Sequence, residues 1–190
     1  CEPHPTRPDA WSIGHDFRSR LLARPEVADR LPSLHAAAAA AFQRRMESTG
    51  LVGQERFQDL AWGELAAEHA YHLLHADPDA GLHEVRRRCA EALAVPVYGP
   101  SWEIDFCIRY LDGLGWPPDS DKLNSAIGEL KEGFRQLARG NAAQAIPMVV
   151  ALADVPGLSP DQRGELHYYA GITHLYGEGK MAAALEQLGE

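Results

Sequence analysis

The chain has 190 residues, a formal net charge of −9 at pH 7 and 45% hydrophobic residues. These values are typical of a globular protein and exclude a disordered or fibrous chain. The acidic balance disfavours a large nonspecific nucleic-acid surface, and no apolar run approaches the roughly 20 residues of a membrane span. Alanine and leucine are abundant while valine and isoleucine are sparse, which favours helices over a sheet-rich fold.

The cysteines indicate a compartment rather than a chemistry. Cys1, Cys89 and Cys107 have no CxxC spacing, so neither a zinc ribbon nor a thioredoxin-like motif is expected. An odd, sparse set suits a reducing compartment, and we expect a cytoplasmic protein. The start at Cys1 without a methionine suggests a piece excised from a longer protein; a lipoprotein whose mature end is a lipidated cysteine is the alternative.

The N-terminal half is expected to form short helices and one helical hairpin. Residues 1–10 hold three prolines and no apolar period, which predicts an irregular segment. Asp77 followed by Pro78 is a strong helix start, and almost nothing separates it from the preceding helix, so an antiparallel hairpin is expected. The sequence predicts helices over 11–22, from Pro25, over 32–48, 57–76, 78–94 and 101–111.

The C-terminal part repeats itself. Gly140 and Gly179 are 39 residues apart, and so are Ala145 and Ala184. Each glycine lies between two amphipathic segments, and each alanine follows five residues later, where a close helix–helix contact needs a small side chain. The sequence predicts helices over 121–139, 142–154, 160–176 and 180–190.

Three further residues define these helices. Ser159 and Gln162 form a capping-box pattern that predicts the start of the helix over 160–176. Pro147 lies inside the helix over 142–154 and is expected to kink it or shift its start.

This pattern of glycine and alanine resembles tetratricopeptide repeats, which pair a glycine in the inter-helix turn with an alanine early in the second helix. The resemblance covers roughly residues 121–190, or two repeats, with Gly133 at the small position of the first helix. The usual period is about 34 residues, so an expanded turn is needed at residues 155–160. The resemblance implies an all-α fold of antiparallel helical hairpins stacked as a right-handed superhelix. A generic helical bundle is the alternative.

A second resemblance concerns the N-terminal half. Gly14-His15-Asp16-Phe17-Arg18, followed by Leu21-Leu22 and then by Leu34-His35 and the alanine run, is similar to the end of the winged-helix region in STAND-type signal-transduction ATPases. This resemblance implies a transcriptional-regulator-like parent protein. Its nucleotide-binding core would lie upstream, outside this chain, and a nucleotide would act only there. We expect three segments, namely 1–50 (winged-helix-like), 51–119 (hairpin and linker) and 120–190 (two repeats).

Histidines form the sharpest candidate for chemistry. His69, His72 and His75 recur every three residues on one helix, near Glu64 and Glu68, and could bind a divalent metal in a metal-dependent hydrolase. A metal needs three or four convergent ligands, however, and His69 is expected to point partly away. Histidines packed inside the hairpin are therefore the preferred interpretation, with no metal.

The run Arg86-Arg87-Arg88 is the densest basic stretch and supports a second alternative, a DNA-binding regulatory fragment. Three consecutive residues of a helix point in three directions, so a solvated face with local ion pairs is preferred and nucleic acid is not the expected partner.

The sequence therefore predicts a module that is not an enzyme and needs no cofactor. It would bind a protein or peptide on a helical-repeat surface and act as a regulatory sensor within a larger signalling protein. An exposed apolar edge at the last helix would favour a homodimer. The candidate partner-binding residues are Arg135, His167, Tyr168, Tyr169 and His174.

Overall fold

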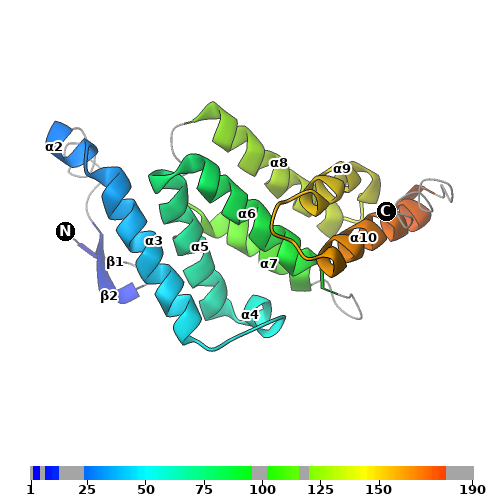
Figure 1. Ribbon diagram of the computed structural model, residues 1–190, viewed down its shortest axis with the longest axis horizontal. Helices are drawn as coiled ribbons and strands as arrows, with labels where there is room; N and C mark the ends of the chain where they lie inside the picture. Colours follow the sequence, from blue (N-terminus) through cyan, green and yellow to red (C-terminus); the bar gives the residue numbers. More distant parts are fainter. Residues whose placement is uncertain (1, 5–6, 13–23, 96–101, 116–119, 179–190) are drawn as a thin grey trace.

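The structure is a computed structural model that describes residues 2–4, 7–12, 24–95, 102–115 and 120–178. Within these ranges the chain forms helices α2 to α10 and one short strand pair. The all-α prediction is confirmed for the body of the protein. Figure 1 shows α2, α3 and the strand pair at one end, α9 and α10 at the other, and α5, α6 and α7 between them, with α8 running above α6 toward α9. None of the described helices combines the length and the apolar character that a membrane crossing requires.

The first residues differ from the prediction. Strands β1 (Glu2–His4) and β2 (Arg7–Ser12) pair antiparallel, where an irregular segment was expected. A two-stranded ribbon leaves one side of each strand without a partner, so it tolerates prolines that a central strand would not. The helix expected over 11–22 is wrong at Trp11 and Ser12, which belong to β2, and its other residues lie outside the described ranges.

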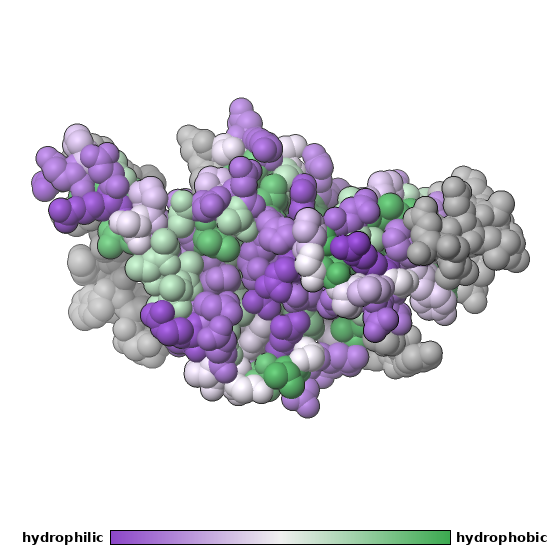
Figure 2. Space-filling view, viewed as in Figure 1, coloured by the Kyte–Doolittle hydropathy of each residue, from purple (hydrophilic) through white to green (hydrophobic). Residues whose placement is uncertain are grey.

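Helices α2 (Pro25–Ala28) and α3 (Leu31–Ser48) begin near the prolines that predicted them. Helix α3 contains the alanine run and packs along α5 (Figure 1). This contact joins residues far apart in the sequence. In Figure 2 the surface over α3 is comparatively apolar, whereas the centre of the same face, over α6, is hydrophilic.

The single helix expected over 57–76 is divided by a cap. Helix α4 (Glu55–Gln58) ends at Asp59, whose extended backbone and carboxylate start α5 (Leu60–Ala76) by accepting a 2.7 Å hydrogen bond from the Trp62 amide. An aspartate at this position satisfies a donor that the new helix leaves free, so the cap overrides the apolar period that continues across it.

The predicted antiparallel hairpin is formed by α5 and α6 (Pro78–Leu93). The Asp77 carboxylate accepts a 3.0 Å hydrogen bond from the Ala80 amide. Gly81 allows the two backbones to touch, because a Cβ built there would lie 2.5 Å from the backbone N and Cα of Leu74. Only glycine, which has no Cβ, therefore fits where α5 and α6 cross.

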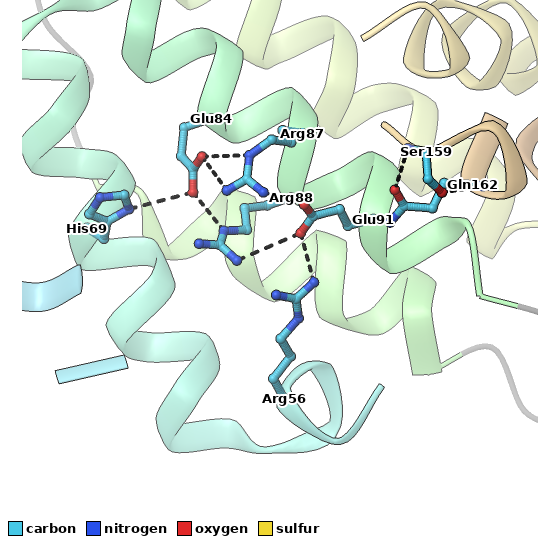
Figure 3. Close-up of polar contacts among 8 residues, drawn as sticks. All are labelled: Arg56, His69, Glu84, Arg87, Arg88, Glu91, Ser159 and Gln162. Carbon is cyan, nitrogen blue, oxygen red and sulfur yellow. Dashed lines mark hydrogen bonds and ion pairs between the residues drawn. The ribbon is translucent and has the colours of Figure 1, made fainter. Parts of the chain in front are cut away.

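The remaining helices follow the predicted order. They are α7 (Trp102–Gly113), α8 (Asp121–Ala138), α9 (Ala142–Ala153) and α10 (Pro160–Glu178). The capping box is confirmed, since the Gln162 side chain accepts from the Ser159 amide at 2.9 Å and Ser159 Oγ accepts from the Gln162 amide at 3.2 Å (Figure 3). Pro147 lies inside α9, which begins before it at Ala142, so the proline does not shift the start of the helix. The helix expected over 180–190, with Gly179 and Ala184, lies outside the described residues.

A single cluster of buried side chains extends from Met46 to Ala170 and draws on all three predicted segments. At its centre the rings of Phe57, Trp62 and Phe106 meet, with Phe57 and Phe106 only 5.0 Å apart between centroids. The segment boundaries stay predictions.

We expect Gly81→Ala to lower the free energy of unfolding by about 3 kcal/mol, because the added methyl group meets backbone atoms that cannot move aside. The matched control is Gly128→Ala in α8, where a Cβ meets nothing within 4 Å; it should stabilise the protein by about 0.5–1 kcal/mol. Urea denaturation of both variants measures the difference. Equal effects would show that the α5–α6 crossing is looser than described.

Candidate interaction groove

A groove runs between one face each of α6, α8 and α9. It consists of two adjoining hollows with volumes of about 660 and 530 Å³. Both hollows are lined by Arg86 from α6, by Ala126 and Glu129 from α8, and by Ala151 from α9, so they form one continuous depression. The size of each hollow is within the range of ligand-binding sites in proteins.

Helix α8 supplies the longest wall of the groove because it is amphipathic, with an apolar face in the core beside a largely polar face on the groove. Leu123, Ile127, Leu130 and Phe134 recur at helical spacing and are buried. The residues of α8 that line the groove extend from Lys122 at one end to Gln136 at the other; they are Lys122, Ser125, Ala126, Glu129, Leu130, Glu132, Gly133 and Gln136. Ser120 starts the helix and accepts a 3.5 Å hydrogen bond from the Leu123 amide. A single amphipathic helix thus contributes to the core and to the groove.

The floor of the groove is apolar, and alanine and glycine lie there among leucine, methionine, valine and proline side chains. Gly133 brings α8 close to α9, since a Cβ built there would lie 2.9 Å from Cγ of Met148. Ala151 and Pro147 on α9 are exposed within the groove. Ala145, the small residue predicted for this helix, is fully buried on the opposite side. The floor therefore offers apolar surface with room above it for inserted side chains.

The rim is charged, and part of its charge has no partner. Asp79 and Lys122 lie 3.7 Å apart, and both are more than 80% exposed. Arg86, Glu129 and Asp154 form no ion pair with any described residue. Glu129 accepts only a 3.1 Å hydrogen bond from the hydroxyl of Ser125.

On the opposite side of α6, charged residues form a buried network (Figure 3). Glu84 accepts hydrogen bonds from Arg88 Nε at 2.7 Å and from Arg87 at 2.7 and 3.0 Å. Glu91 bonds to Arg87 and to Arg56 of α4, the latter at 2.9 Å. Glu84 and Arg88 are 7% and 5% exposed and belong to the interior, whereas the side chains of Arg87 and Arg56 are 27% and 24% exposed, so the network extends from the core to the surface.

The network determines which of the three arginines at 86–88 are exposed to solvent. Burial alone would raise the pKa of Glu84, but the neighbouring Arg88 and Arg87 outweigh it and hold that pKa below its usual value. The Arg88 guanidinium also lies over the Trp62 ring, 5.2 Å from its centroid. Arg88 is thus buried, Arg87 half-buried and Arg86 exposed, so the three arginines do not present one cationic face.

The three histidines considered as metal ligands in the alternative interpretation face different neighbours. His69 Nδ1 lies 3.7 Å from Glu84 of α6. His72 and His75 face α3 instead: His72 Nδ1 is 2.8 Å from Nδ1 of His35, and the His75 ring stacks on that of His35 at 4.7 Å. Among the described residues, no group of three histidine, cysteine or acidic side chains could hold a metal ion.

The predicted partner-binding residues do not share one surface. Tyr168 is 51% exposed, whereas the adjacent Tyr169 packs against the core, and burial with nearby Glu103 and Cys107 raises its pKa to about 12. His167 and His174 are half-buried. Arg135 is exposed on α8, 3.5 Å from Asp112. None of the five lines the groove.

Sequence reasoning missed the groove residues and His35. A signal was present for the groove: Ala126, Gly133 and Ala151 are small residues on helix faces that also carry charged side chains. No such signal paired His35 with His72, because that contact depends on how α3 packs on α5.

Comparisons with protein-family models, with curated proteins and with solved structures give no significant match for this chain. The function proposed below therefore depends on the geometry of the groove and on the residues around it.

We expect Glu84→Gln to lower the free energy of unfolding by about 3 kcal/mol, because it leaves the buried Arg88 guanidinium without its main counter-charge. The control is Glu132→Gln, which removes an exposed partner of Arg139 at 3.9 Å and should cost less than about 0.5 kcal/mol. Chemical denaturation compares the two. Similar losses would contradict a structural role for the network.

Stability should also depend on the histidines. Burial, followed by the nearby His75 and His69, lowers the pKa of His72 below its ordinary 6.5, and burial likewise lowers the pKa of His69. The unfolded chain then binds more protons than the folded one below about pH 6.5, so stability is complete above that pH and falls as the solution is acidified.

The free energy of unfolding, measured from about pH 7 to about pH 5, should therefore decrease toward acid. His72→Asn should flatten this decrease, whereas His83→Asn, at an exposed residue of α6, should leave it unchanged. An unaltered slope in His72→Asn would exclude this residue as a source of the pH dependence.

Proposed function

We propose that this chain is a non-enzymatic interaction module of a cytoplasmic regulatory protein, and that it binds a segment of a protein partner in the groove between α6, α8 and α9. The observation that carries this proposal is the groove itself. It combines an apolar floor with a charged rim over two hollows of about 660 and 530 Å³. Apolar contact provides affinity in such a site, and a few polar groups provide orientation.

A chain segment fits this site better than a compact small molecule. The lining residues of α8 extend from Lys122 to Gln136, which at 1.5 Å per residue is about 21 Å of helix. An elongated ligand can contact both hollows at once, and peptides that bind helical proteins commonly use such grooves.

We also propose that α8, α9 and α10 are packed as tetratricopeptide-like units. Helix α9 contacts both α8 and α10, as the middle helix of such an arrangement would. The close approach of Gly133 to Met148 and the complete burial of Ala145 support the two small positions of the motif. In a STAND-type parent protein this region would act as the sensor, which requires a ligand that distinguishes two states.

The two alternative functions lack comparable support. A metal-dependent hydrolase would need His69 beside His72 and His75, but His69 faces α6 while the other two face α3. A DNA-binding surface would need several exposed cations, but Arg88 is buried and Arg87 is engaged by Glu84 and Glu91.

A blocking substitution tests the proposal. Peptides selected from a random library displayed on phage should bind the wild-type chain and lose about tenfold or more in affinity for Ala151→Gln, which fills the centre of the groove without changing charge. The control is Ala143→Gln, at an exposed residue of the same helix outside the groove. Equal binding to both variants, or no selected peptide, would contradict a binding role for the groove.

A further inference from the structure

We propose that the occupant of the groove is a basic amphipathic helix of a partner protein, which turns its apolar side to the floor and its lysine or arginine side chains to Glu129 and Asp154. This inference rests on the proposed function and adds the chemistry of the partner. It follows from the shape of the floor, the unpaired charges of the rim and the charge of the whole chain.

The shape favours a helix. Residues of α8 that line the groove are spaced three or four apart, and α6 contributes Asp79, Leu82, His83 and Arg86 at the same spacing. Two roughly regular helical walls form a trough whose length of about 21 Å matches about four turns of a ligand helix. The small floor residues Ala126 and Ala151 line both hollows and let a ligand backbone approach closely, so its larger apolar side chains can fill the hollows.

The acidic side chains of the rim that lack an ion-pair partner among the described residues indicate a positively charged ligand. Lys122 lies beside Asp79, and Arg139 beside Glu132, so these four groups partly neutralise one another. Glu129 on α8 and Asp154 after α9 remain without an ion-pair partner among the described residues. The net charge of −9 adds long-range attraction for a cationic partner.

Arg86 gives the ligand its orientation. It is a cation of the α6 wall with no ion-pair partner in the described part of the chain, so it repels basic side chains on that side and directs them toward α8 and α9. A ligand with its charges turned the other way would place cations next to Arg86 and leave Glu129 and Asp154 unsatisfied. The rim therefore selects both the sign and the direction of the ligand charge.

Three synthetic peptides test this proposal. Each is as long as α8 and carries leucine at the helical spacing i, i+3, i+4 and i+7; the other positions are lysine in the first peptide, glutamine in the second and glutamate in the third. Fluorescence anisotropy should show that the lysine peptide binds the wild-type chain about tenfold more tightly than the glutamine peptide. The glutamate peptide should show no binding.

Matched double variants separate the groove from general charge attraction. Glu129→Gln with Asp154→Asn should weaken binding of the lysine peptide about threefold to tenfold. Glu47→Gln with Asp29→Asn makes the same change in net charge at exposed residues of α3 and the end of α2, and should preserve affinity within about twofold. Ala151→Gln, added to either double variant, should abolish binding of the lysine peptide.

The remaining outcomes overturn the proposal in distinguishable ways. Equal binding of the lysine and glutamine peptides, still abolished by Ala151→Gln, would leave the groove as a binding site but reject a basic partner. Equal loss in the two double variants would mean attraction by the overall charge only. If none of the three peptides binds, the basic helix is rejected, and the phage selection shows separately whether the groove binds any peptide.

Discussion

The charged side chains of Glu84, Arg88 and Glu91 form the constraint on which the rest of the structure depends. They lie on α6, the helix that packs against α5, α7, α8, α9 and α10. Two contacts join this charged network to other helices: Glu91 bonds to Arg56 of α4 at 2.9 Å, and the Arg88 guanidinium lies over the Trp62 ring of α5, 5.2 Å from its centroid. A buried charge is expensive unless its partner is held in place, so these contacts favour one rotation of α6 about its axis. That rotation turns Arg86 outward, into the groove, and leaves Leu82 and Val85 for the core.

Local signals predicted those helix starts that depend on a few neighbouring residues. The Asp77-Pro78 and Ser159–Gln162 patterns are satisfied by backbone amides within one turn, so the sequence alone was sufficient there. Asp59 carries the same kind of signal, but the apolar period across it concealed the break between α4 and α5. The strand pair of β1 and β2 was missed because the three prolines among residues 1–10 argued against a ladder.

The candidate site was harder to predict because it is not local. Its walls come from three helices, and only the packing of α6 against α8 and α9 brings Arg86 and Glu129 to the same groove. The histidines illustrate the same limit. Periodicity placed His69, His72 and His75 on one side of a helix, but the neighbouring helices decide that His69 meets Glu84 and His72 meets His35.

The division of charge on α6 explains why a groove in this protein can be acidic although a run of three arginines borders it. Glu84 and Glu91 engage Arg87, Arg88 and Arg56 on the interior side, so only Arg86 is left to face the groove. The opposing walls keep Glu129 and Asp154 exposed. Helix α6 therefore keeps two of its three consecutive arginines out of the groove, and the acidic character of the groove comes from Glu129 of α8 and Asp154 after α9.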